Sequence, residues 1–189
     1  GRRRGDLMGE PDPALAAGDD VVIDRPLASV TVTIDAATAS IRSLVSAEAI
    51  SLAAGSLTVT QAATFSGPLT WTSGTLVGPG TFTVAPGATV TASSGGGKAL
   101  SGAILVNQGA VTWSGYGLDL YSTAAVSNSP GATFEVQGAL VFVAQSGSPV
   151  FTNAGTFRKS GPGTVSFSGV SFTNAGVATG SPAVSHAIA

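Results

Sequence analysis

The chain has 189 residues, of which 43% are hydrophobic and only 10% charged, against roughly 25% charged in an average soluble protein. Its net charge of −2 gives no electrostatic basis for binding nucleic acid, and the absence of Cys excludes disulfides, Cys-based zinc sites and thiol catalysis. No apolar run approaches the roughly 20 residues of a membrane span. Most of the polarity comes from Ser and Thr, which is typical of extracellular or cell-surface proteins.

The two ends of the chain differ from its middle. Residues 1–18 hold Pro11 and Pro13 among small and charged residues, and we expect a flexible N-terminal tail or linker there. Regular structure is predicted over residues 19–180. Residues 176–189 depart from the pattern, and residues 181–189 are expected to form a C-terminal tail.

From residue 19 onward apolar residues recur at every second position, as in Val30, Val32 and Ile34, which predicts short strands with one inward face. Many predicted strands open with Gly, one small residue and then an apolar-x-apolar pattern. These openings lie at 55–59, 67–71, 80–84, 109–113, 138–142 and 163–167. Gly adopts the positive φ that a sharp corner requires, so each unit predicts a corner followed by a strand.

The Ala-rich segment 35–54 leaves two alternatives open. Asp35 is a suitable N-cap for a helix with several apolar residues on one face. The alternative is two more strands, at 39–44 and 49–52. We favour the strands because the next one, at 55–59, follows without a break.

A longer period overlies the alternation. The pentapeptide Phe-Thr-Asn-Ala-Gly occurs at 151–155 and again at 172–176. A repeat near 20 residues is too short for a propeller blade or a helical-pair repeat, but it matches one coil of a parallel β-helix. The sequence therefore predicts an all-β fold, a right-handed parallel β-helix (β-solenoid) of about eight coils.

Four Asn residues follow this period with spacings of 21, 25 and 21: Asn107, Asn128, Asn153 and Asn174. Asn side chains at one corner of successive coils hydrogen-bond to one another. We therefore expect these four residues to form a structural asparagine ladder.

Several segments resemble the repeats of secreted bacterial β-helix proteins: GDDVVID (18–24), VTVTIDAATASIRSL (30–44) and FTNAGTFRKSGPGTVSF (151–167). The architecture is similar to that of autotransporter passengers and filamentous-haemagglutinin-like adhesins. The resemblance covers nearly all of residues 18–177. It implies an extracellular location and a structural or adhesive use, and it carries over no catalytic residues.

Acidic residues are too scarce for the carboxylate clusters of polysaccharide-cleaving enzymes. After Glu48 only Asp119 and Glu135 remain, 16 residues apart, and we expect both to be solvated. His186 lies in the predicted C-terminal tail without a partner. We therefore expect no catalytic residues, no cofactor and no enzymatic activity.

The N-terminal acids offer oxygen ligands for calcium, but their spacing fits neither an EF-hand loop nor an RTX nonapeptide. These acids are Asp19, Asp20, Asp24 and Asp35. We expect them at turns and strand ends, without a metal.

Among the aromatic residues, Trp71 and Trp113 occupy inward strand positions and are expected in the core. Tyr116 and Tyr121 fall at corners and are candidates for glycan contact. The leading hypothesis is an extracellular structural rod whose main partner is itself, since open solenoid ends favour head-to-tail stacking into filaments. The alternative is an adhesin-type module that binds glycans or a cell surface. A polysaccharide-active enzyme ranks third.

Overall fold

The computed structural model describes residues 16–35, 38–93, 95–180 and 184–187, the last range by its backbone. Within these ranges the chain is all-β, without a helix. Every strand pairing in them is parallel. The predicted tail up to residue 15 lies outside the described residues.

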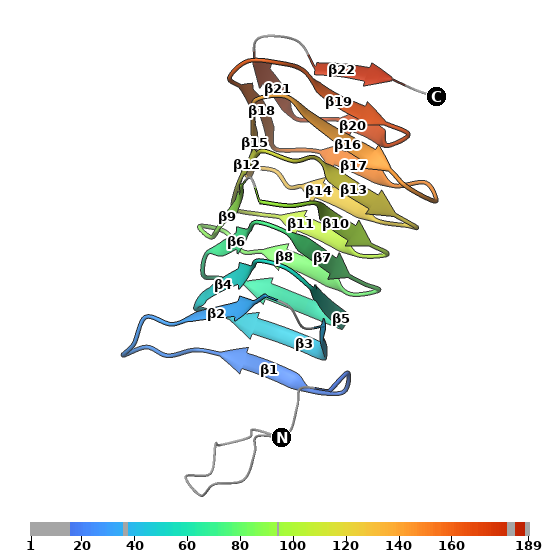
Figure 1. Cartoon of the computed structure of the whole chain (residues 1–189). Helices are drawn as coiled ribbons and strands as arrows, with labels where there is room; N and C mark the ends of the chain where they lie inside the picture. The colour runs from blue at the N-terminus through green and yellow to red at the C-terminus, as the bar shows by residue number, and fades with distance from the viewer. Residues whose placement is uncertain (1–15, 36–37, 94, 181–183, 188–189) are drawn as a thin grey trace, which may run out of the picture.

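The strands form three faces, each a column of parallel strands (Figure 1). Face 1 consists of β1 (Asp20–Ile23), the second halves of β3 (Thr38–Ser46) and β5 (Ser56–Phe65), β8 (Thr81–Val84), β11 (Ile104–Asn107), β14 (Ala125–Asn128), β17 (Val150–Asn153) and β20 (Ser171–Asn174). Face 2 consists of β2 (Thr31–Ile34), β4 (Ala49–Leu52), β6 (Leu69–Trp71), β9 (Thr89–Ala92), β12 (Ala110–Ser114), β15 (Thr133–Gln137), β18 (Thr156–Ser160) and β21 (Val177–Gly180). Face 3 consists of the first halves of β3 and β5, β7 (Gly74–Val77), β10 (Lys98–Ser101), β13 (Leu118–Tyr121), β16 (Leu140–Ala144), β19 (Val165–Ser168) and β22 (Val184–Ala187).

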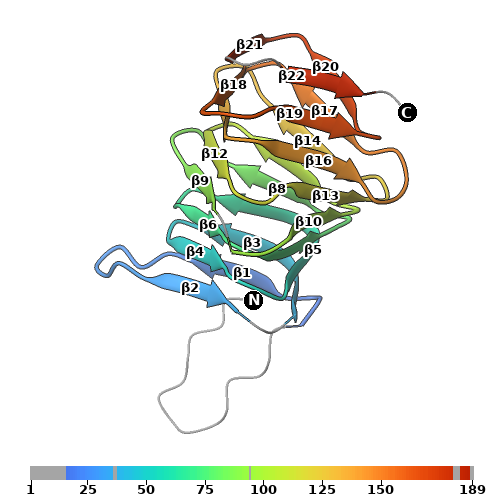
Figure 2. The ribbon, with the colours of Figure 1, turned by 45° about the horizontal axis from the view of Figure 1, so that its top comes forward.

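Each coil visits faces 1, 2 and 3 in that order, and face 2 contributes one strand to each of eight coils. The long strands β3 and β5 turn the corner between faces 3 and 1, so these two faces count as one 14-stranded sheet. Successive coils lie one above another, with β1 and β22 at opposite ends of the rod (Figures 1 and 2). The predicted parallel β-solenoid of about eight coils is confirmed. At about 4.8 Å per coil the rod is on the order of 40 Å long.

Segment 35–54 forms strands where it is described, so the helix alternative is wrong there. Both β3 and β4 pair in parallel with their neighbours: β3 pairs with β5 along both halves, with a register shift between Ile41 and Ser43, and its second half also pairs with β1. Ile41 and Leu44 point inward and are buried. Pairing on both sides satisfies the backbone polar groups of the second half of β3, which a surface helix would have to satisfy within itself.

The core changes character along the rod. Its C-terminal half is aromatic, because equivalent inward positions on adjacent coils carry rings. The Phe142 and Phe167 rings of face 3 stack with centroids 4.8 Å apart, close to the strand spacing. Phe151 of face 1 lies edge-on to both, at 5.3 and 5.5 Å. These contacts join faces 1 and 3 across the interior, and such pairs add to simple area burial.

The glycines that open the strands act in two different ways. Gly55, Gly138 and Gly163 adopt positive φ, as predicted for sharp corners. Gly67, Gly80 and Gly109 do not. A Cβ at each of these three would overlap a main-chain carbonyl oxygen of the preceding coil. At these corners glycine is needed because adjacent coils approach too closely for a side chain.

Within the predicted C-terminal tail, residues 184–187 form β22, which pairs in parallel with β19 and places His186 in register with Phe167. This strand adds a face 3 element to the last coil. Residues 181–183, 188 and 189 lie outside the described residues.

Candidate functional site

The four ladder asparagines occupy one position at the end of successive face 1 strands, where Asn107, Asn128, Asn153 and Asn174 are register partners. Nδ2 of each of the first three donates to Oδ1 of the next Asn, at 2.8, 2.7 and 2.6 Å in chain order. The first three also donate to a main-chain carbonyl at the start of a face 2 strand, at 2.9, 3.0 and 3.1 Å. The ladder therefore ties face 1 to face 2 across four coils.

The ladder is confined to coils 5–8. The equivalent positions on coils 1–4 are Ile23, Ser46, Phe65 and Val84. The lowest member, Asn107, accepts a hydrogen bond at Oδ1 from the Gly109 amide at 3.1 Å, so both ends of its side chain are satisfied. With its donors and its acceptor used in this way, the Asn107 side chain joins coils 5 and 6.

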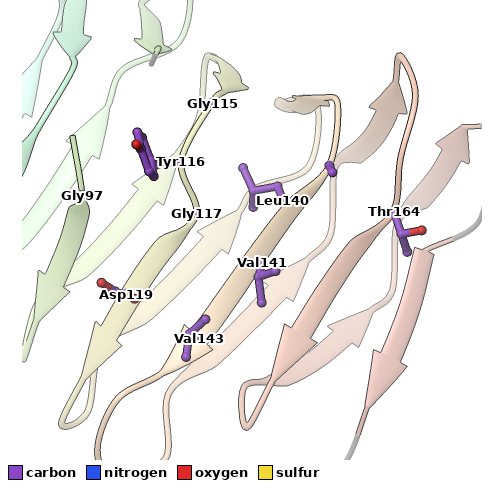
Figure 3. A pocket seen from close by; sticks show the side chains of 10 residues that line it. Gly97, Gly115, Tyr116, Gly117, Asp119, Leu140, Val141, Val143 and Thr164 are labelled. Carbon is purple, nitrogen blue, oxygen red and sulfur yellow. The ribbon is translucent and has the colours of Figure 1, made fainter. Parts of the chain in front are cut away.

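A groove of about 370 Å³ lies on the outer side of face 3 and runs across coils 4–7 (Figure 3). Its floor includes Gly97 and Gly117, and Val141 and Val143 line it on the next coil. Tyr116 stands at one edge with 62% of its surface exposed. The groove thus combines an open aromatic ring, small floor residues and two outward valines.

Two polar features fix this groove in place. Asp119 lies in the groove, and its Oδ1 accepts a hydrogen bond from Gln145 Nε2 at 2.9 Å. The main-chain carbonyl of Tyr116 accepts a hydrogen bond from Trp113 Nε1 at 2.8 Å, and Trp113 is fully buried. The corner that carries the exposed ring is therefore anchored to the core.

The two tyrosines singled out from the sequence do not act together in this groove. Tyr121 lies at the other end of β13, is 38% exposed and is absent from the groove lining. Trp71 and Trp113 are fully buried in the core, with ring centroids 5.5 Å apart.

The two acids considered for catalysis are on different sheets. Asp119 is on β13 of face 3, whereas Glu135 is on β15 of face 2. Glu135 accepts a hydrogen bond from Ser160 Oγ at 2.6 Å and faces Arg158 at 3.4 Å. The Ser160 hydrogen bond, with Arg158, holds the pKa of Glu135 below its ordinary value. The Glu135 carboxylate on coil 6 thus contacts Ser160 and Arg158 on coil 7.

The N-terminal acids are dispersed. Asp20 on β1 pairs with Arg42 on β3, where Arg42 Nε donates to Oδ1 at 2.8 Å and Ser43 Oγ donates to the same oxygen at 2.6 Å. These bonds, that of Arg42 first, hold the pKa of Asp20 well below its usual range. In the part of the chain that the structure describes, no three His, Asp or Glu residues gather closely enough to hold a metal ion.

Two lysines are buried, which the sequence analysis missed. Lys98 is 0% exposed, its Nζ donates to the Gly96 carbonyl at 3.3 Å, and it faces the Trp113 ring at 6.0 Å. Lys159 is 2% exposed and donates to the carbonyls of the corner at 160–162. Burial lowers the pKa of Lys98. The sequence does indicate their burial, because both lysines occupy inward positions in the alternating apolar pattern.

Comparison with protein-family models, with curated proteins and with solved structures finds no match for this chain. Over the described residues, no helix is long and apolar enough to cross a membrane.

Proposed function

We propose that this chain is an extracellular structural rod whose copies stack head-to-tail into filaments. One observation carries the proposal: each end of the described rod presents three strands, one per face, that are paired on one side only. At the N-terminal end these are β1, β2 and the first half of β3, and at the C-terminal end they are β20, β21 and β22 (Figure 1). Open strand edges template further pairing.

The two ends of the rod are complementary in strand direction and in the order of their faces. All strands are parallel, the first described strand lies on face 1 and the last on face 3. A second copy placed on β20–β22 therefore continues the path of the chain without a change of face. The contact repeats the pairing between adjacent coils, and because such a heterologous contact does not close on itself, it propagates.

The side chains at the ends also favour stacking. At the N-terminal end the inward residues Val21, Ile23, Val32 and Ile34 are only half-buried, although they pack against the core. At the C-terminal end Phe172 is half-buried in the same way. Covering these residues with another coil removes apolar surface from water, at about 25 cal/mol per Å².

The extracellular location rests on composition: 10% charged residues, no Cys and a surface rich in Ser and Thr. The proposal assigns no catalytic step to the chain, because Asp119 and Glu135, the acids considered for one, lie on different sheets.

The proposal is tested by sedimentation velocity and negative-stain electron microscopy over a range of concentrations. The decisive variant is Ala178→Lys. Ala178 is exposed on the open edge of β21, and its register partner on β18 is the inward-facing Phe157. A lysine at position 178 is therefore solvated in a single copy, whereas in the proposed stack it would be covered by β2 of the second copy. The matched control is Thr179→Lys on the same strand, which pairs with the exposed Arg158 and points outward.

We expect the native chain and Thr179→Lys to form rods whose length grows with concentration, and Ala178→Lys to stay monomeric. A native chain that remains monomeric at every concentration contradicts the proposal. Equal assembly of Ala178→Lys and Thr179→Lys contradicts it as well, because the end faces would then not be the contact.

A further inference from the structure

We propose that the groove on face 3 is a binding site for a neutral oligosaccharide. This inference goes beyond the structural role proposed above and does not depend on it, because the groove lies on the side of the rod, over coils 4–7, away from both ends. A rod that never assembles retains the groove, and a rod that assembles leaves it uncovered.

The first argument is the shape of the groove. Its lining comes from four successive coils, from Gly97 on coil 4 to Thr164 on coil 7, so it extends about 14 Å along the rod, three strand spacings. A groove that crosses several coils has room for a short linear chain of sugar rings along its length. The floor is low where it crosses coils 4 and 5, because Gly97 and Gly117 present backbone instead of side chains.

The second argument is the chemistry of the walls. A pyranose has an apolar C–H face and a rim of hydroxyl groups. The exposed Tyr116 ring offers a surface for the apolar face, and Val141 and Val143 add apolar side chains on the next coil. The Asp119 carboxylate accepts hydrogen bonds from sugar hydroxyls, and hydrogen bonds to a charged group are the stronger kind.

The third argument is preorganisation. Tyr116 is fixed through its carbonyl by the buried Trp113 Nε1–H, and Asp119 is oriented by Gln145 Nε2. The main chain at Tyr116 and the Asp119 carboxylate are thus held before a ligand arrives, which lowers the entropic cost of binding. At Gly117 a Cβ would overlap the Val141 carbonyl oxygen, so the low floor at this point is built into the packing of coils 5 and 6.

The fourth argument is charge, and it selects the class of sugar. Asp119 is the single charged residue among the described residues that line the groove. The nearest cation in sequence, Lys98, points inward and is fully buried. An acidic glycan would meet a carboxylate with no cation to balance it, so the site favours neutral sugars over uronic acids.

The experiment is a binding titration of the full chain, monitored by NMR, with four hexasaccharide probes. Three are neutral: cellohexaose, mannohexaose and N-acetylated chitohexaose. The fourth is hexagalacturonate, which has the same length but is acidic. A proline-rich hexapeptide, which also stacks on exposed aromatic rings, is the probe that separates a sugar site from a peptide site.

We expect at least one neutral hexasaccharide to bind and hexagalacturonate to bind at least tenfold more weakly. Tyr116→Ala should raise the Kd of the neutral probe at least tenfold, which corresponds to about 1.4 kcal/mol. Asp119→Asn should raise it severalfold, since an amide oxygen is a weaker acceptor than a carboxylate. Tyr121→Ala is the matched control: it removes a partly exposed tyrosine at the far end of β13, outside the groove, and should leave the Kd unchanged.

Three results overturn the proposal: no binding of any neutral probe at millimolar concentration, tighter binding of hexagalacturonate or of the peptide, or an equal loss of affinity in Tyr121→Ala and Tyr116→Ala. Folding of each variant is checked by its far-ultraviolet circular dichroism and its midpoint of thermal unfolding. Because Tyr116 is largely exposed, its replacement is expected to leave the fold intact.

Discussion

Asn128 and Asn153 are 25 residues apart in sequence, and their side-chain amides are joined by a 2.7 Å hydrogen bond inside the rod, where both residues are fully buried. Asn128 Nδ2 also donates to the Thr156 carbonyl at 3.0 Å. A buried amide with both donors used is costly to replace, because its partners are then left without bonds. This relationship gives the first prediction.

Asn128→Asp should lower the free energy of unfolding by about 3 kcal/mol or more at neutral pH, because a buried carboxylate faces two acceptors and has no proton to donate. Burial raises the pKa of such a carboxyl group in the folded state, so the loss should shrink as pH falls through that pKa. Guanidinium unfolding at pH 7 and pH 4 measures both effects. Asn174→Asp, at the exposed end of the ladder, is the control and should cost much less.

The second prediction concerns Lys98, whose ammonium group is buried with one long hydrogen bond. Burial lowers the folded-state pKa of Lys98. The charged ammonium group therefore destabilises the folded state at pH values below this pKa, and the destabilisation disappears as pH rises toward the unfolded value of about 10.4. Lys98→Met should therefore be more stable than the native chain at pH 7, with the difference shrinking by pH 10. Urea unfolding at both pH values measures this.

Lys159→Met is the contrasting variant for this test. Lys159 is buried as deeply, but its Nζ bonds the carbonyls of Ser160 and Gly161 at 2.9 and 2.8 Å. Removing the ammonium group leaves these carbonyls without a donor, so this variant should be destabilised at pH 7. Equal stabilisation by both substitutions would show that hydrogen bonding to the corner contributes nothing.

The third prediction compares two glycines of the groove floor. Gly117→Ala should destabilise the protein by about 1–3 kcal/mol, because the new Cβ overlaps the Val141 carbonyl oxygen and forces coils 5 and 6 apart. Gly97→Ala should be nearly neutral, since a Cβ there meets nothing within 4 Å. Thermal unfolding of the two variants decides the matter. A larger loss for Gly97→Ala would contradict the close approach of coils 5 and 6 at Gly117.

The fourth prediction concerns the ion pair between Asp20 and Arg42, which joins coils 1 and 2. The folded-state pKa of Asp20 is lowered, so its contribution is present above the unfolded value of about 3.9 and is lost as pH falls through the folded-state pKa. Asp20→Asn should be slightly less stable than the native chain at pH 7 and low salt, and the difference should vanish at strongly acidic pH and in high salt, which screens exposed charges. Asp24→Asn, whose side chain makes no ion pair among the described residues, is the control. A difference that persists under acid would contradict the role of the ion pair.

Much of this fold was predictable because the sequence shows two periods, an alternation of apolar residues and a repeat of about 20 residues. Alternation, as in Val30, Val32 and Ile34, fixes which side chains point inward, and the recurrence of Phe-Thr-Asn-Ala-Gly fixes the coil length. The same alternation places Lys98 and Lys159 at inward positions. This was overlooked because charged residues are normally expected to face solvent. The glycines that open the strands were also visible in the sequence. The sequence did not show that Gly67 and Gly109 are needed because adjacent coils approach closely there, and not because of a positive φ.

The sequence by itself determined the strands, the coil length and the identity of the ladder residues, because these follow from local periodicity. Only the tertiary structure decided which outward residues share a site. Coil lengths vary, as the steps of 21 and 25 between ladder residues show, so the neighbour of a residue on the next coil depends on where each corner places its extra residues. This is why Asp119 meets Gln145, 26 residues away, and why Glu135, 16 residues away and less than one coil along, lies on another face.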